Sequence, residues 1–208
     1  MIWRAWNMLE RQQLAKRLKT GDLVFFSGKG LSSDIIRYGT FSKWSHVGMV
    51  LQLDQYDFTT MWEAVPGTGE QCLYSQQLSN GVQVVALHER VKKHFGSISV
   101  RQLMGGELAD VAIAELMSLL ERLKGRHYEQ SFWELARAGW QGPFGENQED
   151  LSSLFCSELV AAAYQCMGLL GGDKPSNEYT PANFSEGQLT QLNNGFYLSR
   201  EVDLFSTD

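Results

Sequence analysis

Residues 152–170, SSLFCSELVAAAYQCMGLL, contain two of the three cysteines of the chain, and Cys156 stands close to the start of a predicted helix. Counted from Cys156, the apolar residues follow the spacing of one helical face: Leu159, Val160, Ala163, Tyr164 and Met167. Ser152 and Ser153 are candidate N-caps, and Gly168 is the expected stop. We therefore expect Cys156 in the first turn, where free N–H groups and the helix dipole favour a thiolate. The alternative is a cysteine that packs as a small apolar residue on a buried face.

The composition is that of an ordinary globular protein. The chain has 208 residues, 43% hydrophobic and 20% charged, which predicts a single domain over 1–208. A formal net charge of −6 argues against a general nucleic-acid binder, so no nucleic-acid partner is expected.

Cysteines and histidines lack the spacings of disulfide frameworks and metal sites. The cysteines stand at 72, 156 and 166 without a CxxC pair, and the histidines at 46, 88, 94 and 127 show no HxxxH or HExxH pattern. No apolar run reaches the ~20 residues of a membrane span, and residues 1–19 lack the apolar core of a secretion signal. We expect a cytoplasmic protein with no metal and no organic cofactor.

The N-terminal segment 1–19 is predicted to be an amphipathic helix. Trp3 and Trp6 stand among arginine and lysine residues, a pattern typical of helices that lie on a membrane surface. One interpretation is therefore a peripheral membrane contact. The other is that the aromatic side packs on the domain.

The rest of the chain predicts strands first and helices later. Short β-rich runs follow the turn at Gly21-Asp22 and recur between turn residues, over 23–26, 46–53, 60–65 and 82–87. Helical patterns follow over 106–125, with Gly125 as the stop, and over 131–140. This order predicts an α+β domain, with residues 185–208 as a C-terminal extension.

A cysteine nucleophile needs a base and usually a third group that orients the base. His46 opens a β run after a polar turn, and Glu63 stands inside the apolar run TMWEAV, where burial is costly unless the carboxylate is paired. If the two strands are neighbours, Glu63 is able to hold the His46 ring. The alternative places Glu63 on a solvent-facing side of its strand. His88, His94 and His127 stand in charged surroundings and are expected to be solvated.

Several motifs resemble the NlpC-type cysteine peptidases of the papain-like fold. They are GDLVFF (21–26), SHVGMVL (45–51), WEAV (62–65), FCSELV (155–160) and YTPANF (179–184). In that family the cysteine helix comes first, whereas here the histidine strand comes first. The order is similar to the circularly permuted branch, the YaeF/YiiX-like permuted papain-like amidases, related to the lecithin:retinol acyltransferase group. The resemblance implies a permuted papain-like fold, with an antiparallel sheet or half-barrel packed against helices.

The resemblance also implies roles for individual residues. Cys156 would be the nucleophile, His46 the base and Glu63 the residue that orients it. Tyr128 would place its hydroxyl near the reacting carbonyl, beside an oxyanion site at the N–H of Cys156, although the glycine-rich tail expected after this tyrosine is replaced by EQSFWEL. Whether Tyr179 shares the pocket stays open.

The expected activity is that of a thiol amidase or peptidase that forms an acyl-cysteine intermediate on a peptide-like amide. The first alternative is a lipid acyl hydrolase or acyltransferase with the same triad, which the N-terminal helix favours. The second is a binding module that does not turn over its ligand. The sequence does not give the oligomeric state.

Overall fold

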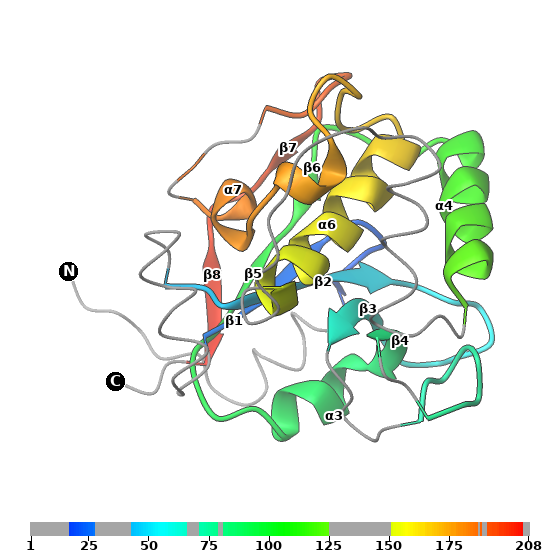
Figure 1. The fold of residues 1–208 in the computed structure, drawn as a ribbon, viewed down its shortest axis with the longest axis vertical. Coiled ribbons are helices and arrows are strands. Elements are labelled where there is room, and N and C mark those ends of the chain that lie inside the picture. Colours follow the sequence, from blue (N-terminus) through cyan, green and yellow to red (C-terminus); the bar gives the residue numbers. More distant parts are fainter. Residues whose placement is uncertain are drawn as a thin grey trace.

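A six-stranded antiparallel sheet is the centre of the molecule (Figure 1). The computed structural model describes residues 17–27, 43–65, 71–78, 81–124, 151–186, 188 and 191–205. The strand order is β4-β3-β2-β1-β5-β8. The strands are β1 (Leu23–Phe26), β2 (His46–Leu51), β3 (Thr60–Val65), β4 (Gly81–Ala86), β5 (Ile98–Arg101) and β8 (Val202–Phe205).

Both faces of the sheet are covered. Helix α6 (Leu151–Cys166) crosses one face against β2 and β3, with α4 (Asp110–Leu123) beside it (Figure 1). A second, smaller apolar cluster lies on the other face and includes Leu87 from the short helix α3 (Leu87–Lys92). Strand β1, LVFF, is apolar throughout because both of its faces are buried. Leu23 and Phe25 belong to the larger apolar cluster under α6, while Val24 and Phe26 belong to the smaller cluster on the other face.

Helix α6 ends where the sequence predicts and begins earlier. Gly168 has φ +74°, and the N–H groups of Gly168 and Leu169 donate to the carbonyls of Gln165 and Tyr164, which is a Schellman motif. The predicted stop is confirmed. The helix starts at Leu151, however, so Cys156 is its sixth residue and lies in the second turn. The prediction of a first-turn cysteine was wrong, because extending a formed helix by one residue costs little even where serine is a good cap.

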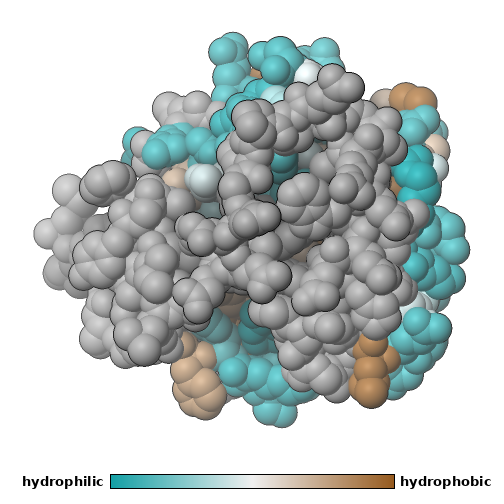
Figure 2. Space-filling model, in the orientation of Figure 1, coloured by the Kyte–Doolittle hydropathy of each residue, from teal (hydrophilic) through white to brown (hydrophobic). Residues whose placement is uncertain are grey.

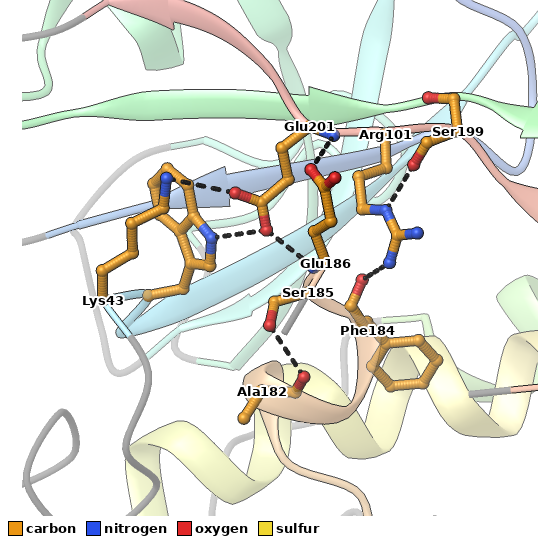
Figure 3. A network of polar contacts seen from close by, with 9 residues as sticks. Lys43, Arg101, Ala182, Phe184, Ser185, Glu186, Ser199 and Glu201 are labelled. Atoms are coloured by element: carbon orange, nitrogen blue, oxygen red, sulfur yellow. Dashed lines mark hydrogen bonds and ion pairs between the residues drawn. The ribbon is translucent and has the colours of Figure 1, made fainter. Parts of the chain in front are cut away.

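The C-terminal segment is part of the main sheet. Strand β8 pairs with β5, and a two-stranded sheet joins β6 (Leu103–Met104) to β7 (Tyr197–Leu198). Arg101 ties these elements together by donating to the backbone carbonyls of Phe184 and Ser199 (Figure 3). It also donates to the carbonyl of Leu198. The extension predicted over 185–208 therefore supplies an edge strand, which no local pattern indicated.

Two short helical elements connect α6 to this segment. They are the 3₁₀ helix η1 (Ser176–Glu178) and α7 (Pro181–Phe184). The N-cap residue Thr180 and Asn183 form a capping box at the start of α7.

The α+β fold class is confirmed, with differences at the element ends. Helix α4 is shorter than the predicted 106–125, and Leu87 begins α3 instead of ending a strand. The helix predicted over 131–140 and residues 1–16 of the N-terminal helix lie outside the described residues.

Within the described ranges, no helix is both long and apolar enough to span a membrane. The large apolar side chains exposed there are scattered, as Figure 2 shows for one face of the molecule. They are Leu78, Phe95, Met104, Val111 and Tyr197.

Candidate active site

His46 is the first residue of β2, and the residues around it fix its backbone. It pairs with Phe26 of β1, and the N–H of Ser45 donates to the Phe26 carbonyl at 3.0 Å. The Phe26 ring lies 5.7 Å from the imidazole, centroid to centroid. The Nε2 atom of His46 lies 2.7 Å from Oε2 of Glu63.

Glu63 is a fully buried carboxylate in the middle of β3. Besides the contact with His46, it accepts a hydrogen bond from Gln83 Nε2 at 2.9 Å, its cross-strand partner on β4. The Nε of Arg90, on α3, donates to both carboxylate oxygens at 3.0 and 3.2 Å. Gly48 on β2 makes room for this cluster, because a Cβ there would lie 3.3 Å from the Cβ of Glu63 and 2.9 Å from the sulfur of Met61.

The partners of Glu63 keep it ionised. Burial raises the pKa of a carboxyl group, but the hydrogen bond and charge of His46, the charge of Arg90 and the hydrogen bond from Gln83 outweigh burial and lower the pKa of Glu63 to about 2. Glu63 is therefore a carboxylate at any physiological pH.

Cys156 is buried on α6, and its side chain hydrogen-bonds to His46. Burial lowers the pKa of the imidazole, but the charge and hydrogen bond of Cys156 and then those of Glu63 raise it, to about 9. Because Nε2 is taken by Glu63, Nδ1 is the ring nitrogen left for the thiol. The raised pKa favours the imidazolium form of His46 at neutral pH.

The structure thus brings together three of the four residues that the sequence singled out. Cys156, His46 and Glu63 come from α6, β2 and β3, and Tyr128 lies outside the described residues. Tyr179 is buried beside α6, where its carbonyl accepts the Ser157 hydroxyl at 2.6 Å and its ring stacks on Phe184.

The expected oxyanion donor needs a correction. Only the first four N–H groups of a helix lack a partner inside it. With α6 beginning at Leu151, the N–H of Cys156 is directed to the carbonyl of Ser152 in the helix ladder. The earlier helix start therefore removes the free N–H that a first-turn cysteine would have offered.

Sequence reasoning missed Gln83 and Arg90. Gln83 is the one polar residue inside the apolar run VQVVA, which is a usable signal for a buried partner. Arg90 has no such signal, because only the packing of α3 under the sheet edge brings it to Glu63. His94, expected to be solvated, is half-buried: its ring lies 5.1 Å from that of Phe26, and its Nε2 lies 3.2 Å from the Ser27 carbonyl.

The part of the chain that the structure describes contains no group of three or more histidine, cysteine, aspartate or glutamate residues able to hold a metal ion.

The motif order, the fold and the cysteine–histidine–glutamate cluster agree with a comparison against protein families. A family described as permuted papain-like amidase enzymes, YaeF/YiiX, the C92 family, matches residues 17–175. The chain belongs to this family. The permuted papain-like amidase match contains Cys156, His46, Glu63, Gln83 and Arg90, and it ends before η1 and β8. Membership supports a cysteine-hydrolase type of function.

A solved structure similar to this chain is the crystal structure of the metalloprotein yiiX from Escherichia coli O157:H7. The two share 25% sequence identity with a TM-score of 0.47, over 71% of this chain and 65% of the other. The chain therefore spans just under two thirds of that protein. None of the curated proteins matches significantly.

Proposed function

We propose that the protein is a thiol amidase or peptidase that cleaves a peptide-like amide through an acyl-cysteine intermediate. The observation that carries this proposal is the His46 ring, which contacts the Cys156 thiol and the Glu63 carboxylate at the same time. In the proposal Cys156 is the nucleophile, His46 the general acid and base, and Glu63 the residue that orients the ring.

The chemical steps follow from this assignment. The Cys156 thiolate attacks the amide carbonyl, the C–N bond breaks, and the His46 imidazolium gives its proton to the leaving amine. The acyl group is now bound to Cys156 as a thioester. The neutral His46 takes a proton from a water molecule while the water oxygen attacks the thioester carbonyl. Collapse releases the carboxylic acid and restores the thiolate–imidazolium pair.

The charge balance of the cluster supports this cycle. With Cys156 as the thiolate of the proposed cycle, its charge and that of Glu63 are balanced by the charges of the His46 imidazolium and the Arg90 guanidinium. A buried ion without a counter-charge is strongly unfavourable, and the balance allows the nucleophile to stay ionised away from water.

The deciding experiment traps the acyl intermediate. Purified protein is incubated with a panel of peptide amides and phospholipids, quenched in acid, and analysed by mass spectrometry for acyl groups on Cys156. Cys156→Ala should lose the adduct. Cys166→Ala is the matched control on the same helix and should keep it, because Cys166 takes no part in the cluster.

The outcomes separate the three classes of function. An amide-derived acyl group supports the proposal. A fatty acyl group overturns it in favour of a lipid acyl hydrolase or acyltransferase. The absence of any adduct overturns it in favour of a binding module.

Alkylation gives a substrate-free test of the nucleophile. Cys156 and Cys72 are buried, while Cys166 is partly exposed, so exposure alone predicts that iodoacetamide modifies Cys166 first. Activation by His46 predicts Cys156 first near pH 6. Faster modification of Cys166 or Cys72 would argue against an activated Cys156.

A further inference from the structure

Arg90 contacts the buried end of the cluster, away from the thiol. Its Nε lies 3.0 Å from Oε1 and 3.2 Å from Oε2 of Glu63. Its guanidinium carbon lies 4.7 Å above the Phe26 ring, and the same ring flanks His46. Two independent contacts therefore fix the guanidinium beside the carboxylate that holds the histidine.

We propose that Arg90 is a positioning residue of the active site. It shares the Glu63 carboxylate with His46, which weakens the attraction between that carboxylate and the imidazolium and makes the imidazolium a better proton donor. The inference rests on the proposed function, because it assigns to Arg90 the task of keeping the imidazolium able to give its proton away.

The division of the two carboxylate oxygens supports this role. Oε2 of Glu63 contacts His46 at 2.7 Å and Arg90 at 3.2 Å, while Oε1 accepts hydrogen bonds from Gln83 at 2.9 Å and from Arg90 at 3.0 Å. Without Arg90, the full negative charge of a buried carboxylate would act on the imidazolium alone. An imidazolium held in this way is a weaker acid toward a leaving amine.

The remaining charged and titratable groups near this cluster do not replace Arg90. Cys156 approaches His46 from α6, and Gln83 on β4 is neutral. His94 lies on the other side of Phe26, and burial and the charge of Arg90 lower its pKa, which favours a neutral ring. Among the described groups around Glu63, Arg90 is thus the permanent cation.

Lysine cannot do the same in this position. A guanidinium is planar and stacks on an aromatic ring while its N–H groups meet a carboxylate in the plane. An ammonium at this site would keep the charge but lose the stack on Phe26 and the contact with both oxygens of Glu63.

The test titrates the His46 ring directly. In a Cys156→Ala background, NMR of the histidine ring protons is followed against pH for the parent, Arg90→Gln, Arg90→Lys and Lys92→Gln. The Cys156→Ala change removes the sulfur beside the ring, so differences between the His46 titrations of these variants report on Glu63 and Arg90. Lys92→Gln is the matched control, because it removes an exposed positive charge from the same helix.

We expect the His46 midpoint to move up by about one pH unit in Arg90→Gln, and by less in Arg90→Lys. Lys92→Gln should leave it within a few tenths of a unit. A midpoint in Arg90→Gln that equals that of Lys92→Gln, or moves down, overturns the inference. If Arg90→Gln does not fold, an Arg90→Lys midpoint equal to the parent value overturns it.

This measurement is independent of the proposed reaction. It uses no substrate and no thiol, so a protein that forms no acyl adduct still reports whether Arg90 shares Glu63 with His46. Failure of the proposed function and failure of this inference therefore have different signatures.

Discussion

Two glutamates bind side chains at or just before the start of β2, and the surroundings of their carboxylates differ. Glu63 is fully buried and faces an imidazole, a guanidinium and an amide. Glu201, just before β8, accepts the indole N–H of Trp44 at 3.0 Å and the N–H of Glu186 at 2.8 Å, and its other oxygen pairs with Lys43 at 3.1 Å (Figure 3). One carboxylate contacts the ring of His46, and the other binds the side chains of Lys43 and Trp44, which stand three and two residues before that histidine.

The different partners of the two carboxylates predict different roles for them. Glu63 lies inside the part of the chain that matches the amidase family, and its partners include the His46 ring, whose pKa is raised to about 9. Glu201 lies beyond that part, and its partners Lys43 and Trp44 do not belong to the cluster around Cys156. We therefore expect changes at Glu63 to act mainly on reactivity, and changes at Glu201 to act mainly on stability.

The largest expected effect is on the reactivity of Cys156. Glu63→Gln should lower amide turnover by roughly tens to thousands of fold, a smaller loss than the ~10⁴-fold drop seen when the orienting aspartate of a serine protease is neutralised. Glu201→Gln should stay within about threefold, because it keeps an acceptor for Trp44. Initial rates on the best amide substrate, with circular dichroism as a check of folding, decide the comparison. Equal losses in the two variants would show that both carboxylates act only as structural supports.

The dependence of stability on pH should also differ. The pKa of Glu63 falls from about 4.5 to about 2, so its contribution is present above 4.5 and is lost as the pH drops toward 2. The pKa of His46 rises from 6.5 to about 9, so its contribution is present below 6.5 and is lost as the pH rises through 9.

Urea unfolding of the wild type and both glutamine variants measures these contributions. The advantage over Glu63→Gln should be greatest between about pH 4.5 and 6.5 and shrink on both sides. The advantage over Glu201→Gln should shrink on the acid side only, because burial is outweighed there by hydrogen bonds from Glu186, Trp44 and Lys43 that lower the pKa of Glu201. An alkaline decline for Glu201→Gln as well would mean that the two clusters are coupled.

A smaller effect concerns the Trp44 indole. Trp44 is buried, and Glu201→Ala leaves its N–H without this acceptor, which should cost about 1–3 kcal/mol of unfolding free energy. Glu201→Gln should recover most of this loss. A Glu201→Ala protein as stable as the wild type would show that the hydrogen bond between Trp44 and Glu201 contributes nothing to stability.

The smallest effect is expected at Lys43. Its side chain is 54% exposed, so Lys43→Gln should change the unfolding free energy by no more than about 1 kcal/mol. The difference should decrease in added salt. A larger effect that persists in salt would place Lys43 among the buried contacts of the cluster.

Local sequence patterns determined most of the strands and helices of this protein. The alternation and apolar runs of β1 to β4, the periodicity of α4 and α6 and the glycine that ends α6 are encoded within a few residues of each feature. The order of the motifs placed the chain in its family, and the types of Cys156, His46 and Glu63 pointed to a thiol mechanism. These features depend on near neighbours, so the sequence was sufficient.

Only the tertiary structure decided what surrounds those residues. Arg90 reaches Glu63 because α3 packs at the β4 edge of the sheet, and Glu201 reaches Trp44 because β8 joins the sheet at β5. The start of α6 at Leu151 likewise moved Cys156 out of the first turn. Contacts between residues 27 or 157 positions apart depend on how whole elements pack, and no spacing in the sequence encodes them.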